Sequence, residues 1–197
     1  MMAKKANEKE ASKKGTRELL EEKIEIPPGI EANLENGIIT FRGPKGESSK
    51  NFFDSKIPVK KEGNSIVIRA SRSTKRDKTK VYTFLAHLKN MIRGVQEGYV
   101  YRLKVCSSHF PIKATVSGND FSVKNFLGER KARTMKIPAG VKVTVDASTI
   151  TVEGADKEIT SQTAARMEQI CIIKNRDRRI FQDGIYITEK AGESLLE

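Results

Sequence analysis

The sequence predicts an α+β fold with two tandem, similar modules, each an antiparallel β-sheet packed against one α-helix. Three observations lead to this prediction: an internal repeat with a strand–turn–strand pattern, one amphipathic helical segment after each copy, and further segments with the period-2 pattern of strands. The chain has 197 residues, which is enough for one large domain or two small ones.

The repeat aligns residues 26–43 without gaps with residues 137–154, an offset of 111. Both copies begin Ile-Pro, have glycine two residues later and end on glycine. A residue that precedes proline is held extended, and glycine permits a tight turn. The alternating residues that follow predict two strands joined by a polar turn. The repeat therefore predicts one β-hairpin in each module.

One helix is expected after each hairpin. Residues 80–94 place apolar side chains on one face, and Gly94 is expected to end this helix as its C′ residue. In the second module, Thr160 is expected to cap a helix at 161–170. Further strands are expected at 65–71, 99–108, 111–116 and 120–126.

These elements divide the chain into four parts. Residues 23–108 form the expected first module and residues 109–190 the second. Residues 1–22 are a low-complexity tail of basic and acidic residues, and residues 191–197 are a short C-terminal tail.

Charge indicates the class of partner. Lys and Arg number 37 against 25 Asp and Glu, so the net charge is +12. Such an excess favours a polyanion, with nucleic acid first and an acidic membrane surface second. The sequence shows neither a long apolar run nor a long helix with a wide apolar face, so we expect no membrane partner. Trp is absent, which argues against recognition by rows of stacked aromatic rings.

Catalytic patterns are weak. No phosphate-binding glycine motif occurs, and Cys106 and Cys171 lack the spacing of a zinc site, so they are expected to be reduced thiols. The group Ser107-Ser108-His109 has no acidic residue nearby to orient a base. A small hydrolase that uses Ser107 or His109 is therefore a distant alternative. We expect no enzyme activity, cofactor, metal or small-molecule substrate.

Three basic clusters are the candidate binding sites. Residues 69–80 read as an exposed, mobile loop, for which the alternative is a merely solubilising loop. Residues 128–133 precede the second hairpin, and residues 174–179 follow the second helix. For the last cluster, the alternative is a set of surface ion pairs with Asp177 and Asp183. The candidate RNA-binding residues are Arg69, Arg72, Lys75, Arg76, Arg130, Lys131, Arg133, Lys174, Arg176, Arg178 and Arg179. Since they lie in loops rather than on one recognition helix, they favour shape-reading of a folded RNA over major-groove reading of DNA.

Several blocks of the sequence also resemble a known family. The blocks are residues 24–46, 90–105, 109–112, 125–145, 163–169 and 174–193. These blocks resemble segments that occur in the same order in the large-subunit ribosomal protein number six family. Their residues are more similar to the archaeal and eukaryotic branch of that family. The resemblance covers roughly residues 23–193, so the N-terminal tail is outside it.

The resemblance implies two tandem α+β modules without catalytic activity. It implies a cytoplasmic structural constituent of the large ribosomal subunit that supports translation by binding large-subunit rRNA. The implied position is near the subunit interface, the stalk base and the sarcin–ricin loop, beside other large-subunit proteins and close to translation factors. The second module is implied to be the main RNA anchor, although residues 50–104 carry net +10 and residues 141–197 carry net −2. A free-standing regulator that binds structured RNA is the alternative.

Overall fold

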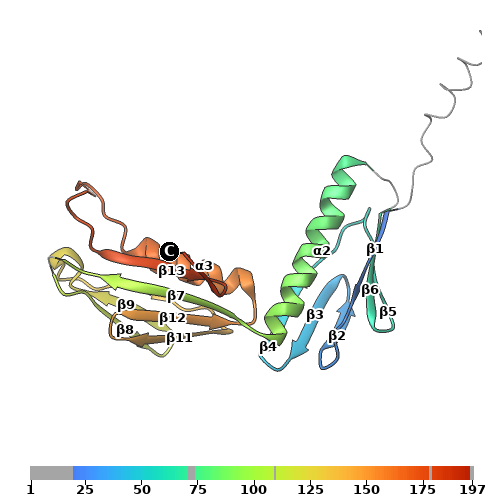
Figure 1. The fold of residues 1–197 in the computed structure, drawn as a ribbon, viewed down its shortest axis with the longest axis horizontal. Coiled ribbons are helices and arrows are strands. Elements are labelled where there is room, and N and C mark those ends of the chain that lie inside the picture. Colours follow the sequence, from blue (N-terminus) through green and yellow to red (C-terminus); the bar gives the residue numbers. More distant parts are fainter. Residues whose placement is uncertain (1–19, 71–73, 109, 178, 196–197) are drawn as a thin grey trace, which may run out of the picture. The chain divides into compact units, whose positions relative to one another are not determined.

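The structure is a computed structural model that describes residues 20–70, 74–108, 110–177 and 179–195 (Figure 1). Arg72, His109, Arg178 and the first 19 residues of the expected tail lie outside these ranges. Its strands are β1 (Leu20–Glu25), β2 (Glu31–Glu35), β3 (Ile38–Gly43), β4 (Gly46–Asn51), β5 (Val59–Glu62), β6 (Ser65–Ala70), β7 (Tyr99–Cys106), β8 (Lys113–Ser117), β9 (Asp120–Lys124), β10 (Arg133–Lys136), β11 (Val141–Asp146), β12 (Thr149–Gly154), β13 (Gly184–Lys190) and β14 (Glu193–Ser194). Its helices are α2 (Lys75–Gln96), the short 3₁₀ helix η2 (Phe126–Gly128) and α3 (Lys157–Ile170). The predicted α+β class with tandem modules is confirmed.

The chain forms two compact units. The N-terminal unit comprises the residues up to Pro28 together with Ala32–Thr40 and Lys50–Lys89. The C-terminal unit comprises Gly29–Glu31, Phe41–Ser49 and Asn90–Glu197. In the N-terminal half of the chain, β1, β6 and β5 form one antiparallel sheet, and β2, β3 and β4 form another. Val81 and Leu88 of α2 are fully buried, and the ring of Phe84 meets that of Phe52 edge-on at 5.3 Å.

The C-terminal unit has a three-stranded sheet with the order β10-β9-β8 and a five-stranded sheet with the order β11-β12-β7-β13-β14. Helix α3 packs against β7, β12 and β13 (Figure 1). The core between the helix and the strands contains the buried side chains of Tyr101, Leu103, Ile150, Val152 and Met167. Along β7, residues 101 and 103 face this core while the intervening residues are exposed, as expected for a sheet with one covered face.

The repeated hairpin is confirmed. Strands β2 and β3 turn at Asn36, whose φ is 50°, and β11 and β12 turn at Ala147, whose φ is 49°. These residues are 111 apart, the offset of the sequence repeat. Gly43 and Gly154, which end the two copies of the repeat, are both required to be glycine for the same steric reason. A Cβ on Gly43 would overlap the Val95 side chain, and one on Gly154 would overlap that of Thr160. Only glycine lets each hairpin approach the helix this closely.

The similarity between the N-terminal and C-terminal parts of the chain extends beyond the repeated hairpin. It includes a second set of strands, which occur in a different order along the chain. Strand β1 pairs with β6 of the β5–β6 hairpin, and β10 pairs with β9 of the β8–β9 hairpin. Ile26 N donates to Asn64 O at 2.9 Å, and Ile137 N, which is 111 residues later, donates to Asn119 O at 2.7 Å. The β5–β6 hairpin follows β1 along the chain, whereas the β8–β9 hairpin precedes β10. The chain therefore forms two similar three-stranded sheets from elements in permuted order.

Three element boundaries differ from the sequence-based expectations. Strand β7 is expected in the first module, but it pairs with β12 and β13 in the C-terminal unit. Strand β1 begins at Leu20, within the expected N-terminal tail, because residues 20–25 pair with β6. Strand β14, which lies in the expected C-terminal tail, pairs with β13. In each case a partner strand distant in sequence determines the assignment.

The expected end of the first helix and the expected start of the second are both wrong. Gly94 lies inside α2, where a Cβ would overlap the Ala155 carbonyl oxygen. Gly98, with φ of 79°, follows the helix end instead, and its N–H donates to Gly94 O at 3.0 Å. Helix α3 is capped by Asp156, whose carboxylate accepts hydrogen bonds from Glu158 N at 2.7 Å and Ile159 N at 3.2 Å, and not by Thr160.

The segment at 69–80 is not the expected loop over its whole length. Arg69 and Ala70 end β6, and Lys75 begins α2. Thr74 Oγ1 accepts a hydrogen bond from Asp77 N at 3.2 Å and lies 2.6 Å from Asp77 Oδ2. Thr74 is therefore the N-cap of α2, and its side chain fixes where the helix starts.

Candidate nucleic-acid interface

Arg133 ties the first basic loop of the C-terminal unit to the end of α3. From the start of β10, its Nε and Nη2 donate to the Glu129 carboxylate at 2.8 and 2.6 Å. Its Nη1 donates to the carbonyl oxygen of Ile170, the last residue of α3, at 2.5 Å, and its guanidinium lies 4.3 Å from the centre of the Phe126 ring. Hydrogen bonding to Arg133 also lowers the pKa of the Glu129 carboxyl group. Arg133 thus holds the loop at 128–132 against the end of α3.

This contact holds the first basic loop at the end of α3, and the second basic loop follows that end along the chain. Arg130 and Lys131 are exposed in the first loop, and Lys174 and Arg176 are exposed beyond α3. The positive charge of Arg176 also contributes to lowering the pKa of the Glu129 carboxyl group, after the larger effect of Arg133. We call the exposed set the basic loop surface; its residues are Arg130, Lys131, Lys174, Arg176 and Arg179.

Short contacts order the second loop. The Asp177 carboxylate accepts a hydrogen bond from Arg179 N at 2.9 Å, and the Asp177 carbonyl accepts from Phe181 N at 3.0 Å. The guanidinium of Arg176 lies 4.9 Å from the centre of the Phe181 ring. The Arg179 side chain is 91% exposed and only 3.4 Å from Asp177, so this surface ion pair leaves it accessible to a phosphate.

One ion pair of the alternative set is present, between Arg179 and Asp177 at 3.4 Å. Asp183 is 1% exposed, and its carboxylate accepts hydrogen bonds from Ser108 N at 2.5 Å and Ser108 Oγ at 2.7 Å. It therefore ties the end of β7 to the start of β13. No sequence pattern signals this pairing, because 75 residues separate the two positions.

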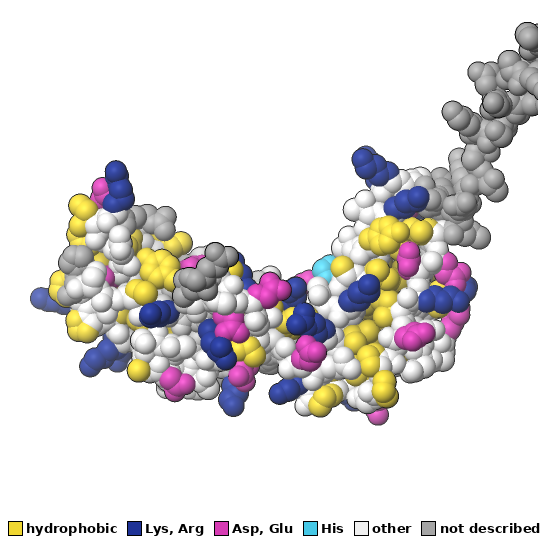
Figure 2. Space-filling view, viewed as in Figure 1, with side chains coloured by type: hydrophobic (Ala, Val, Ile, Leu, Met, Phe, Trp, Pro, Cys, Tyr) yellow, Lys and Arg dark blue, Asp and Glu magenta, His cyan; other side chains and the backbone are white. Residues whose placement is uncertain are grey.

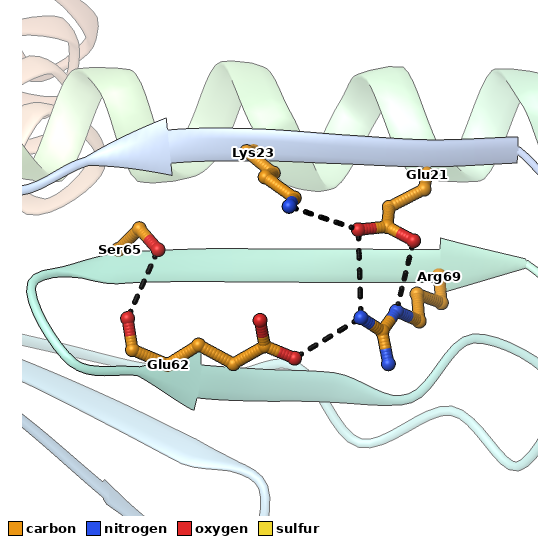
Figure 3. Close-up of polar contacts among 5 residues, drawn as sticks. All are labelled: Glu21, Lys23, Glu62, Ser65 and Arg69. Carbon is orange, nitrogen blue, oxygen red and sulfur yellow. Dashed lines mark hydrogen bonds and ion pairs between the residues drawn. The ribbon is translucent and has the colours of Figure 1, made fainter.

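Arg69 is held by ion pairs within the N-terminal unit. Figure 3 shows its guanidinium between Glu21 of β1 and Glu62 of β5, at 3.0 and 3.1 Å. Lys23 is 3.4 Å from Glu21, and the hydrogen bond from Arg69 lowers the pKa of the Glu21 carboxyl group. Glu21 lies directly opposite Arg69 in the β1–β6 register. Arg69 therefore connects three strands, and we leave it out of the interface.

Lys75 and Arg76 remain candidates in the N-terminal unit. Both are exposed on the first turn of α2, and neither forms an ion pair with a residue in the described ranges. Positive side chains here repel the positive end of the helix dipole, which a bound phosphate would relieve. Lys80, one turn later, is instead 2.6 Å from Asp54 and lowers the pKa of that carboxyl group.

On the face shown in Figure 2, basic side chains form separate groups rather than one continuous field. Figure 2 shows Lys and Arg interspersed with Asp and Glu over the face in view. This pattern suits a few fixed phosphate contacts better than diffuse attraction.

Other kinds of site find little support. Among the residues that the structure describes, no group of three or more His, Cys, Asp and Glu side chains could hold a metal ion. No helix within those ranges is both long and apolar enough to span a membrane. Burial raises the pKa of the Cys171 thiol to about 11, so this cysteine is an unreactive core residue at neutral pH.

Known proteins are similar in sequence to this chain over most of its length. The family model described as ribosomal protein L6 matches residues 26–98 and 110–184. The chain is 44% identical over 169 residues to the large ribosomal subunit protein uL6 of Methanocella arvoryzae, covering 85% of this chain and 96% of the relative. It is 46% identical to the protein of that name from Sulfurisphaera tokodaii, covering 87% and 92% of the two chains. The corresponding protein of Saccharolobus solfataricus is 43% identical, with 87% and 96% covered. The two matched segments contain the two copies of the hairpin, and the chain belongs to the ribosomal protein L6 family.

Proposed function

We propose that this protein is a structural constituent of the large ribosomal subunit and binds large-subunit rRNA through the basic loop surface. The observation that carries the proposal is the position of Arg133, which holds one basic loop at the helix end that the other basic loop follows, in a chain of this family. The relatives' names, which place them in the large ribosomal subunit, support the assembly. The role is structural rather than enzymatic.

The chemistry of the surface suits an RNA backbone. Arg130, Arg176 and Arg179 present planar guanidinium groups that can bind phosphate oxygens in pairs, and Lys131 and Lys174 add point charges. These contacts carry no base code, so specificity comes from the fixed spacing of the two loops against a folded RNA. Arg133 contributes by positioning the loops and does not itself bind RNA.

We further propose, from the family resemblance, the position near the subunit interface, the stalk base and the sarcin–ricin loop. Other large-subunit proteins would lie beside the chain there, and translation factors would act close by. The compartment is the cytoplasm. Retention on large subunits through a high-salt wash is expected for a constituent, whereas a free-standing regulator would dissociate.

The test compares two charge reversals of equal size. Arg176→Glu with Arg179→Glu changes the basic loop surface, and Lys75→Glu with Lys78→Glu changes exposed residues of α2. At one salt concentration, the first pair is expected to weaken binding to deproteinised large-subunit rRNA roughly tenfold more than the second. Circular dichroism confirms that both variants are folded. Equal losses would show that only bulk charge matters and would refute the assigned surface.

A further inference from the structure

An open cavity of about 670 Å³ lies where β7 ends and β13 begins. Its lining includes Lys104, Cys106, Ser107, Gln182, Asp183 and Tyr186. The volume lies in the range of small-molecule sites and exceeds what one nucleotide needs. The sequence alone does not reveal this site, because its two sides come from segments about 75 residues apart.

Buried contacts fix one wall of the cavity. The Asp183 carboxylate, which is almost fully buried, accepts the hydrogen bonds from Ser108 N and Oγ described above. These bonds hold the Ser107–Ser108 backbone against the first residues of β13. The wall is therefore formed before any ligand binds, which lowers the entropy cost of binding.

Tyr186 provides an aromatic surface. A Cβ on Gly184 would lie 3.2 Å from Tyr186 Cζ and Oη, so the ring lies directly against the glycine backbone. The Tyr186 hydroxyl donates to Gln182 O at 2.9 Å, and the residue is still 39% exposed. The ring is thus held in place with part of its surface open to the cavity, as a stacking platform requires.

Lys104 provides the charge. It lies directly opposite Tyr186 in the β7–β13 register, so both side chains lie on the same face of the sheet. Lys104 is exposed, and its side chain makes no hydrogen bond or ion pair with a described residue. A cation beside a supported aromatic ring, with amide and hydroxyl groups around them, matches the needs of a nucleotide.

The cavity also continues from the basic loop surface. Gln182 Nε2 donates to Arg179 O at 3.2 Å, so the cavity begins three residues beyond a proposed phosphate contact. An RNA backbone that follows Arg179 would bring a neighbouring nucleotide to the cavity mouth.

We propose that this cavity binds one unpaired nucleotide of the rRNA, and this inference rests on the proposed function. The base stacks on Tyr186, the phosphate meets Lys104, and the Gln182 side chain reads the base edge. An acidic segment of a neighbouring protein could form an ion pair with Lys104, but it would not stack on the Tyr186 ring.

A tryptophan reporter tests the stacking directly. The chain has no Trp, so Tyr186→Trp introduces a single fluorophore at the platform. Titration of the full-length variant with deproteinised archaeal large-subunit rRNA is expected to quench its fluorescence. The matched control, Tyr82→Trp, replaces a tyrosine that is 50% exposed on α2 and is expected to change little.

Affinity and salt dependence separate stacking from charge. Tyr186→Ala is expected to weaken rRNA binding roughly tenfold with an unchanged salt slope, and Tyr186→Phe to restore the affinity. Lys104→Gln is expected to reduce the salt slope by about one, whereas Lys113→Gln, an exposed lysine of β8, leaves binding nearly unchanged. Thermal unfolding confirms that each variant is folded.

The outcomes distinguish the two proposals. If the wild type binds rRNA but the Tyr186→Trp fluorophore is not quenched and Tyr186→Ala binds equally well, the nucleotide site is wrong while the proposed function stands. Quenching that occurs only in intact subunits would identify a protein segment as the occupant and would also overturn the site. If the wild type does not bind the rRNA, both proposals fail.

Discussion

Arg133 and Arg130 are three residues apart in one basic cluster, but the structure gives them different surroundings. The Arg133 guanidinium contacts Glu129, the Ile170 carbonyl and the Phe126 ring, whereas Arg130 is exposed. A basic cluster in a sequence does not reveal this difference, because the carbonyl partner comes from α3, 37 residues away.

Arg133→Gln is expected to lower the free energy of unfolding by about 2 kcal/mol. The substitution removes the two charge-assisted hydrogen bonds to Glu129 and the cation–π contact with Phe126. The expected value is kept low because the Glu129 side chain is partly exposed to solvent. Arg130→Gln is expected to change it by less than about 0.5 kcal/mol, as exposed substitutions usually do. Urea denaturation measures both values. Equal stability of the two variants would remove the structural role of Arg133.

Cys171 predicts a stability change at alkaline pH. Because burial raises its pKa to about 11 from the ordinary value of 9.0, the unfolded chain releases the thiol proton first as pH rises. The stability that comes from keeping the buried thiol protonated is fully present below pH 9 and is lost between pH 9 and 11. The loss amounts to about 2 kcal/mol by pH 10.5.

The measurement compares the wild type with Cys171→Ala and Cys106→Ala across this pH range. Cys171→Ala is less stable at pH 7 because a core side chain is truncated, but its stability should fall less steeply above pH 9. Cys106→Ala is the matched control for the change of a cysteine to alanine. Parallel curves for all three proteins would contradict the assignment.

Within α2, Gly94 is a position where a change from glycine to alanine is expected to destabilise the helix rather than stabilise it. Replacing an internal helical glycine with alanine normally stabilises a helix by about 1 kcal/mol. Here the new Cβ would overlap the Ala155 carbonyl oxygen and come 2.8 Å from the Tyr99 ring, both in the C-terminal unit. Gly94→Ala is therefore expected to destabilise the protein by about 1–3 kcal/mol in thermal denaturation. Lys89→Ala, at an exposed position of the same helix, is the control, and a stabilised Gly94→Ala protein would disprove the close approach.

Strand β7 decides where the chain can be divided. It lies between β12 and β13 in the five-stranded sheet, and its Leu103 side chain is fully buried. A fragment that starts at residue 109, the boundary expected from the sequence, lacks this central strand and is expected to show no cooperative thermal transition. A fragment of residues 90–197 keeps the strand and should unfold cooperatively. Cooperative unfolding of the shorter fragment would show that β7 is dispensable.

These elements show how far sequence could predict the fold. Local patterns predicted the repeated hairpins, because the Ile-Pro step, the turn and the alternating strands lie within 18 residues. The helices were also predicted, but their ends were not. Asp156 caps α3, although Thr160 offered the same kind of side chain. The partner of β7 and the Glu21–Arg69 pair depend on strands distant in sequence, which single-chain periodicity does not reveal.

At the scale of the whole molecule, the segment with the highest net positive charge is not the segment that carries the proposed binding surface. Residues 50–104 carry most of the positive charge, but four basic residues of this segment are in ion pairs with carboxylates, namely Arg69, Lys80, Arg93 and Arg102. Residues 141–197 are slightly acidic, yet Lys174, Arg176 and Arg179 are exposed there. Sequence therefore identified the basic loops as candidates, while the contacts of Arg133 and Arg69 favour structural roles for these two candidates.

The salt dependence of rRNA binding tests the central claim most directly. Each phosphate contact releases counterions, so about five contacts should weaken wild-type binding by roughly 10²–10³ between about 50 and 200 mM salt. Replacing all five residues of the basic loop surface with alanine is expected to remove most of this slope. Replacing five exposed N-terminal residues with alanine should remove little of it; these are Lys56, Lys60, Lys61, Lys78 and Lys89. A nearly flat wild-type response, or the same reduction of slope in both variants, would contradict an RNA anchor at the basic loop surface.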